Sequence, residues 1–152
     1  MDMGTAALEI MGFVAAGAMG WFGTAFLGRP IRHFFDLRGE VIRRWTQCTN
    51  VRARWREDPS KTWQTVEEPG FTEADAKRLE EAEGIFRELA SQMRAFAQNE
   101  TLAVWIVKLL RYDPVMASSG LIGISHSLAT YGRNRVLQKK RVQDALRFRE
   151  LP

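Results

Sequence analysis

Cysteine and histidine are scarce in this chain of 152 residues, which contains one cysteine and two histidines. The single Cys48 excludes a disulfide within the chain and is typical of a reducing compartment. Neither His33 nor His126 lies in a cluster of cysteines and carboxylates at ligand spacing, so the sequence predicts no metal site. It also lacks a glycine-rich phosphate loop and a dinucleotide fingerprint, so no cofactor is expected.

Charged side chains are absent from residues 10–28 (IMGFVAAGAMGWFGTAFLG). A helix of that length, at ~1.5 Å per residue, spans about 28 Å, which is close to the hydrocarbon thickness of a bilayer. The sequence therefore predicts a transmembrane helix over residues 10–28, after a short extracytoplasmic tail over residues 1–9. A cleaved signal peptide is the alternative, but it needs a basic region at its start, and this start is acidic.

Basic residues lie on one side of the predicted span only. All 22 lysines and arginines follow Gly28, whereas Asp2 and Glu9 are the charges that precede the span. Basic residues near a span favour the cytoplasmic side, so we expect the N-terminus outside and the rest of the chain in the cytoplasm. The basic C-terminal segment, which includes Arg135 and Lys139, could contact the phosphates of a nucleic acid. In a membrane-tethered chain such charges more often face lipid or solvent, so we do not expect nucleic acid as a partner.

Small residues recur through the predicted span at helical spacing. Positions three and four apart share one face of a helix, where small side chains let a second helix approach closely. This row predicts that the span packs against another membrane protein or against itself, although small residues are common in membrane spans generally. The predicted packing face comprises Gly12, Ala16, Gly17, Gly20, Gly23 and Thr24.

Residues 29–58 are predicted to form an amphipathic juxtamembrane helix. Pro30 ends or kinks the preceding span and starts this helix, whose periodicity fades from about Cys48. Residues 59–71 contain prolines and a glycine and are predicted to be a loop. The apolar face of the helix could lie among lipid headgroups or could cover the core of the domain, and the sequence leaves both open. The residues assigned to the membrane interface are Phe34, Phe35, Arg38 and Trp45.

Arg38 interrupts the apolar face of the juxtamembrane helix, because it projects from the middle of that face. An unpaired charge would be costly to bury there. In the preferred account, the guanidinium extends along the apolar surface to reach the headgroups. The alternative is a buried ion pair with a carboxylate of a later helix, for which the candidates are Glu81, Glu88 and Asp113.

Residues 72–152 are predicted to form a cytoplasmic helical domain. Thr72, followed by Glu73 and Asp75, is typical of a helix start. The helix that follows has an apolar seam formed by Leu79, Ala82, Phe86, Leu89, Met93 and Phe96. Residues 101–111 are predicted to be a short helix that is either buried or lies in the membrane surface with Trp105 as its anchor. A small-residue helix over residues 114–132 and a basic helix from Arg133 complete the domain.

The segment from Gly123 to His126 resembles the first half of the G-x-S-x-G motif of hydrolases, with Ser125 at the place of the nucleophile. The final glycine is missing, and the segment is predicted to be helical on both sides. A nucleophile elbow needs a strand before the serine, so we expect no hydrolase activity.

Two stretches, FLGRPIRHFFDLRGEVIRR and LIGISHSL, resemble a group of uncharacterised bacterial single-span membrane proteins. In that group the span continues into a helix with a proline and a Leu-Arg pair, and a Leu-Ile-Gly-Leu-Ser-Asn patch occurs near the C-terminus. His126 stands where the pattern has asparagine. The resemblance implies a bacterial inner-membrane protein in which Leu37, Gly123 and Ser125 form a structural patch, with Arg38 also at a demanding position. It implies no activity.

We therefore expect an all-α protein, with one N-terminal transmembrane helix followed by a small cytoplasmic helical bundle. The predicted function is non-enzymatic: a membrane-anchored interaction protein that serves as an accessory or scaffolding subunit of a membrane complex. The alternative is a peripheral lipid-sensing or membrane-remodelling module that uses the aromatic and basic residues of the juxtamembrane helix. The expected partners are the lipid bilayer and either another membrane protein or a second copy of the chain.

Overall fold

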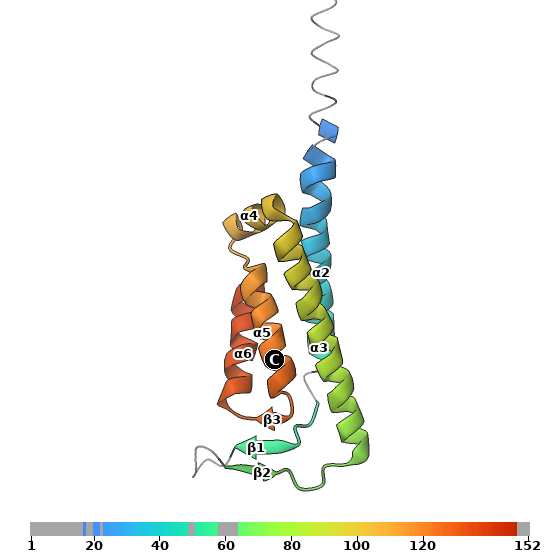
Figure 1. The fold of residues 1–152 in the computed structure, drawn as a ribbon, viewed down its shortest axis with the longest axis vertical. Coiled ribbons are helices and arrows are strands. Elements are labelled where there is room, and N and C mark those ends of the chain that lie inside the picture. The colour runs from blue at the N-terminus through green and yellow to red at the C-terminus, as the bar shows by residue number, and fades with distance from the viewer. Residues whose placement is uncertain (1–16, 18–19, 22, 49–50, 58–63, 149–152) are drawn as a thin grey trace, which may run out of the picture.

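The computed structural model describes residues 17, 20–21, 23–48, 51–57 and 64–148. These residues are mostly helical, as predicted, but the all-α assignment is wrong because three short strands form a sheet (Figure 1). Of the predicted span over residues 10–28, residues 10–16, 18–19 and 22 lie outside the described residues. Among the helices that are described, none has both the length and the apolar character needed to cross a membrane.

The helix that enters the domain contains a wider turn just before α2. Thr24–Gly28 form a π-helical turn, η1, which is closed by a hydrogen bond from the Arg29 N–H to the Thr24 carbonyl, and α2 (Arg29–Cys48) follows directly. Pro30 has no N–H to donate to the carbonyl four residues before it, and a π turn at this point accommodates the missing bond. The break predicted at Pro30 is therefore a local widening of one helix.

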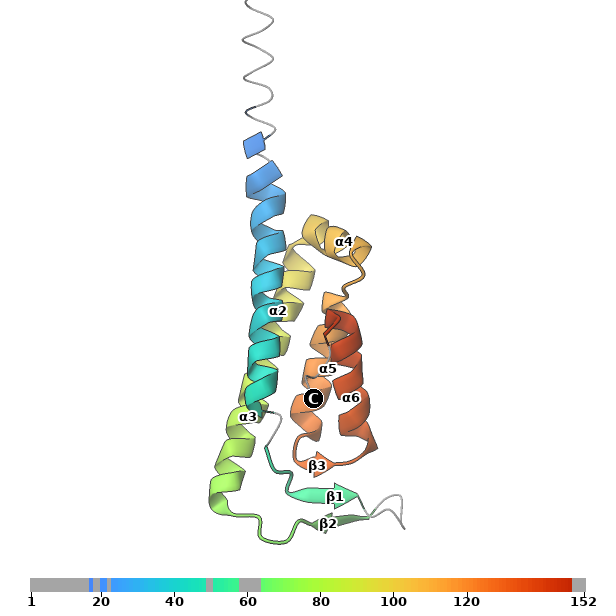
Figure 2. The same ribbon diagram turned by 180° about the vertical axis from the view of Figure 1, so that it is seen from behind.

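Four further helices lie in the described residues after α2: α3 (Glu73–Asn99), α4 (Thr101–Leu109), α5 (Pro114–Ser127) and α6 (Arg133–Leu146). α3 lies against α2 and α5, and α5 lies against α6 (Figures 1 and 2). Thr72 forms the predicted cap of α3, since its hydroxyl accepts from the Asp75 N–H and the Asp75 carboxylate accepts from the Thr72 N–H. Asp113 caps α5 with a single hydrogen bond, in which its carboxylate accepts from the Met116 N–H at 3.0 Å.

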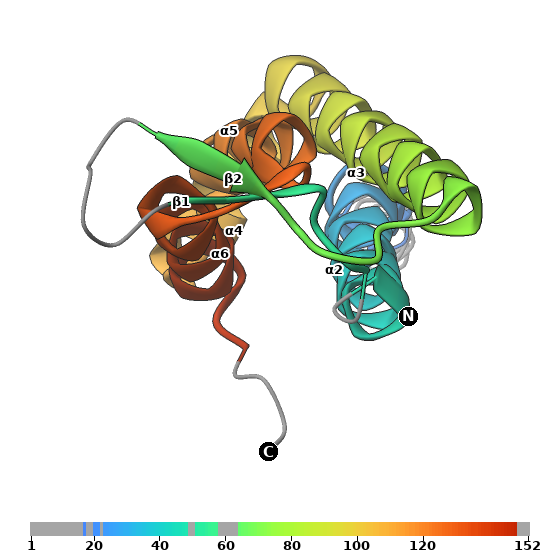
Figure 3. The ribbon, with the colours of Figure 1, turned by 90° about the horizontal axis from the view of Figure 1, so that it is seen from below.

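The sheet lies at the end of the domain opposite to the one where the N-terminal helix leaves (Figures 1 and 3). Its central strand β1 (Trp55–Glu57) pairs antiparallel with β2 (Thr65–Glu67) and parallel with β3 (Thr130–Tyr131). The helix predicted over residues 29–58 is wrong beyond Cys48, because α2 ends there and β1 follows within that range. β2 lies in the predicted loop over residues 59–71, and β3 lies in the expected helix over residues 114–132. Strands this short carry too few alternations to stand out in a sequence.

The core lies between α2, α3, α5 and α6. All six residues of the predicted seam of α3 are buried, which confirms that prediction. α2 contributes one buried residue at almost every turn, and α5 and α6 close the core from the other side. The largest fully buried side chains are Phe34, Met93, Leu121, Ile124, Leu128, Leu146, Val41, Val107 and Val142.

Candidate functional surface

The predicted packing face of the N-terminal helix is only partly described. Gly12 and Ala16 lie outside the described residues. At Gly17, Gly20 and Gly23, no other described part of the chain comes within 4 Å of where a Cβ atom would stand. The domain that follows therefore leaves this described part of the face uncovered.

Two of the residues assigned to the membrane interface lie in the core of the domain instead. Phe34 is 0% exposed, and its ring lies 5.5 Å from the ring of Phe96. Trp45 is 4% exposed and meets Phe86 edge to face at 6.1 Å. The interface assignment is wrong for both residues, because α3 covers the apolar face of α2. Phe35 is exposed, yet its ring also contacts the domain, at 5.7 Å from the ring of Tyr112.

Arg38 joins α2 to the C-terminal end of α6. Its Nε donates to the carbonyl of Leu146 at 2.8 Å, and one of its terminal nitrogens donates to the carbonyl of Arg147 at 3.2 Å. The last carbonyls of a helix lack partners within the helix and carry its negative dipole end, so a guanidinium satisfies them well. No carboxylate among the described residues pairs with Arg38. The predicted buried ion pair with a carboxylate of a later helix is therefore wrong, whereas a contact of Arg38 with lipid headgroups stays a prediction.

Replacing Arg38 by methionine is expected to lower the free energy of unfolding by about 1.5 kcal/mol, because two carbonyls at the end of α6 lose a charged donor. Arg43→Met on the same helix is the matched control, since Arg43 makes an exposed ion pair with Glu40. Exposed pairs contribute about 0–1 kcal/mol, so this control should change stability less. Urea denaturation of the full chain in mild detergent measures both variants, and equal losses would contradict the capping role of Arg38.

The residues of the predicted structural patch are divided between two helices. Leu37 lies in the core from α2, whereas Gly123 and Ser125 belong to α5. The Ser125 hydroxyl is buried and donates to the carbonyl of Ile122 within the same helix at 2.8 Å. A Cβ at Gly123 would stand 2.5 Å from the side-chain amide carbon of Gln138 on α6. Ser125 lies near the C-terminal end of α5, and helix precedes it where a nucleophile elbow needs a strand.

α4 exposes apolar side chains on its outer side, in the segment for which the sequence left burial and the membrane surface both open. Ala103 and Val107 are buried on its inner side, while its outer side and the start of α5 present six large apolar residues to solvent. Each of the six is between 39% and 64% exposed. We call this set the α4 patch: Leu102, Trp105, Leu109, Leu110, Val115 and Met116.

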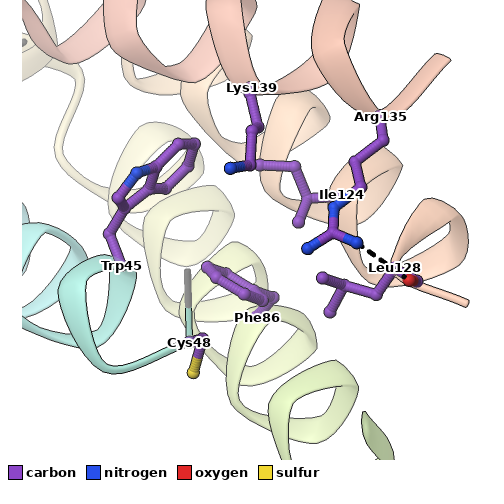
Figure 4. A pocket seen from close by; sticks show the side chains of 7 residues that line it. All are labelled: Trp45, Cys48, Phe86, Ile124, Leu128, Arg135 and Lys139. Carbon is purple, nitrogen blue, oxygen red and sulfur yellow. Dashed lines mark hydrogen bonds between the residues drawn. The ribbon is translucent and has the colours of Figure 1, made fainter. Parts of the chain in front are cut away.

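Arg135 is a buried cation, although it was grouped with charges that face lipid or solvent. It is 5% exposed and donates to the carbonyls of Leu128 at 3.3 Å and Val51 at 3.4 Å, while its Nε finds no acceptor among the described residues. Burial lowers the pKa of its guanidinium. Figure 4 shows Arg135 and Lys139 reaching from α6 into a pocket beside Trp45, whose ring centre lies 5.7 Å from the Lys139 Nζ.

The arrangement around Arg135 is structural in character. The guanidinium ties the end of α5 to the segment that follows α2, and the aromatic rings beside Lys139 are core residues. Within the described residues, no group of three or more histidine, cysteine, aspartate or glutamate side chains is placed to hold a metal ion.

Comparison of this chain with family models, with curated proteins and with solved structures gave no match. Its function is therefore inferred from the N-terminal helix, the α4 patch and the charges around them.

Proposed function

We propose that this protein is a membrane-anchored interaction protein, an accessory or scaffolding subunit of a complex in the bacterial inner membrane. The observation that carries the proposal is the course of its N-terminal helix, which continues from α2 beyond the domain (Figure 1). No other described part of the chain covers the glycines of that helix. An uncovered face of small residues gains packing contacts when a second helix lies against it.

The distribution of charge supports a membrane anchor with the N-terminus outside. Residues 10–28 are uncharged, and the exposed Arg29 and Arg32 follow them immediately. Such residues hold the end of a span at the cytoplasmic surface. The N-terminus would then lie outside and the helical domain in the cytoplasm.

The proposed anchor and the domain share one helix. α2 is held in the core by Phe34, Leu37 and Val41, so the domain cannot turn freely about the chain that leaves it. A partner that packs against the N-terminal helix would therefore also fix the position of the cytoplasmic domain. This coupling is what a scaffolding subunit requires.

Replacing Gly20 by isoleucine is expected to weaken assembly about tenfold, which corresponds to about 1.4 kcal/mol, because the branched side chain prevents close approach of a second helix. Ala18→Ile is the matched control, since residues two positions apart in any helix of 3.6 residues per turn are separated by about 160° around its axis. The amount of defined oligomer or co-purified partner in mild detergent measures both variants.

Assembly that is unchanged by Gly20→Ile, or reduced equally by Ala18→Ile, would contradict the proposal. A chain that stays monomeric without a partner and binds vesicles of anionic lipid would favour the alternative, a lipid-sensing module. Burial of Phe34 and Trp45 removes two of the aromatic residues on which that alternative relied.

A further inference from the structure

The α4 patch makes α4 apolar on two sides. Ala103 and Val107 face the core, whereas Leu102, Trp105 and Leu109 recur at intervals of three and four on the exposed side. A helix that is apolar all round is normally surrounded by apolar groups. The described part of the domain supplies them on one side only.

The position of the α4 patch indicates which surface covers the other side. α4 lies beside the first turns of α2, at the end of the domain from which the N-terminal helix departs (Figures 1 and 2). It also lies across the direction of that helix. If the N-terminal helix crosses a bilayer, α4 runs along the membrane surface, and its nine residues, about 14 Å long, are too few to cross.

Exposed cations accompany the α4 patch, as expected for a surface that meets anionic headgroups. They are Lys108, Arg111, Arg29 and Arg32. Two carboxylates lie in the same region. Glu100 is the residue before α4, and Asp113 precedes α5, where its carboxylate accepts a hydrogen bond from the Met116 N–H. The tryptophan at the centre of the patch is the side chain that favours a membrane–water interface.

We propose that the α4 patch rests in the headgroup layer of the bilayer and forms a second, peripheral membrane contact beside the anchor. This inference rests on the membrane anchor of the proposed function. With two contacts at one end, the domain has a fixed tilt and presents its sheet end to the cytoplasm. The ligand of the patch is a phospholipid surface that contains anionic headgroups.

Fluorophore labelling of the full chain in vesicles of phosphatidylcholine and phosphatidylglycerol tests the inference. A polarity-sensitive dye is attached to a cysteine introduced at one of three positions: Leu109→Cys in the patch, Val66→Cys as an exposed apolar control on β2, and Trp21→Cys in the predicted span. Burial raises the pKa of the Cys48 thiol, so the dye reacts with the introduced cysteine. Nitroxide lipids then quench the dye from a shallow or a deep position in the bilayer.

The dye at position 109 is expected to lose more than about half of its emission to shallow nitroxides and less to deep ones, since an interfacial helix inserts only about 5–10 Å. The dye at position 21 should be quenched most by deep nitroxides. The dye at position 66 should keep its emission with either quencher.

Emission at position 109 that matches position 66, while position 21 remains deeply quenched, would overturn the patch contact and leave the anchor intact. Energy transfer between copies labelled at position 109, without quenching by lipid, would show that a second copy covers the α4 patch. That result would also overturn the contact between the patch and the bilayer. Loss of deep quenching at position 21 contradicts the anchor of the proposed function, and the inference as stated fails with it.

Discussion

Replacing Phe34 by alanine is expected to lower the free energy of unfolding by about 3–5 kcal/mol, as for other large side chains removed from a core. The side chain is fully buried, and its ring lies 5.5 Å from the rings of both Phe96 and Tyr112. The cavity left behind would be bordered by α2, α3 and the segment after α4. None of these elements can close it without breaking other contacts.

Phe35→Ala is the matched control, one position further along the same helix. Phe35 is exposed and contacts Tyr112 on one side, so its removal should cost about 1–2 kcal/mol. Urea denaturation of the full chain in mild detergent, followed by tryptophan fluorescence, measures both. If both variants lose equally little free energy of unfolding, α2 lies outside the domain core. That result would restore the alternative in which the aromatic residues of α2 face lipid.

Replacing Gly120 by alanine is expected to lower the free energy of unfolding by about 2 kcal/mol, within the usual cost of overpacking. A Cβ at this position would stand 2.6 Å from a methyl carbon of Val142 and 3.3 Å from its backbone nitrogen. The backbone of α6 would have to move, because the methyl group of a buried valine has little freedom. This loss exceeds the gain of about 1 kcal/mol that alanine brings to a helix interior.

Gly84→Ala is the control for that helix gain. Gly84 is exposed on α3, and no described atom beyond its own helix backbone and chain neighbours lies within 4 Å of the place that a Cβ atom would take. The variant should therefore be stabilised by about 0.5–1 kcal/mol. Thermal or urea unfolding is therefore expected to show a lower free energy of unfolding for Gly120→Ala and a higher one for Gly84→Ala. Stabilisation of both would show that α5 and α6 lie further apart than in this structure.

Local signals predicted several elements correctly. The cap at Thr72 and the alternating seam that follows it predicted α3, and the Asp113-Pro114 pair predicted the start of α5. These signals succeed because capping and amphipathic periodicity depend on residues within a few positions of one another. The resemblance to single-span proteins placed Gly123 in a tight position, whereas the closest approach to a partner backbone occurs at Gly120.

Contacts between distant segments were not predictable in the same way. Arg38 donates to a carbonyl 108 positions away, and an acceptor on the backbone leaves no mark in the sequence because every residue carries one. Arg135 looked like one more charge of a basic tail, yet its partners are also backbone carbonyls. The three strands pair across the domain, and they were missed because each is too short for its alternation to stand out in the sequence.

The sequence by itself determined the helical character of the domain and the helix starts, because both depend on local spacing and capping. Its uncharged stretch and one-sided charge also yield the predictions of an anchor and an orientation, which remain predictions. Only the tertiary structure decided which apolar faces are buried. Phe34 and Trp45 are covered by other helices, whereas Leu102, Trp105 and Leu109 are left exposed. Periodicity shows that a face is apolar, and only packing shows what lies against it.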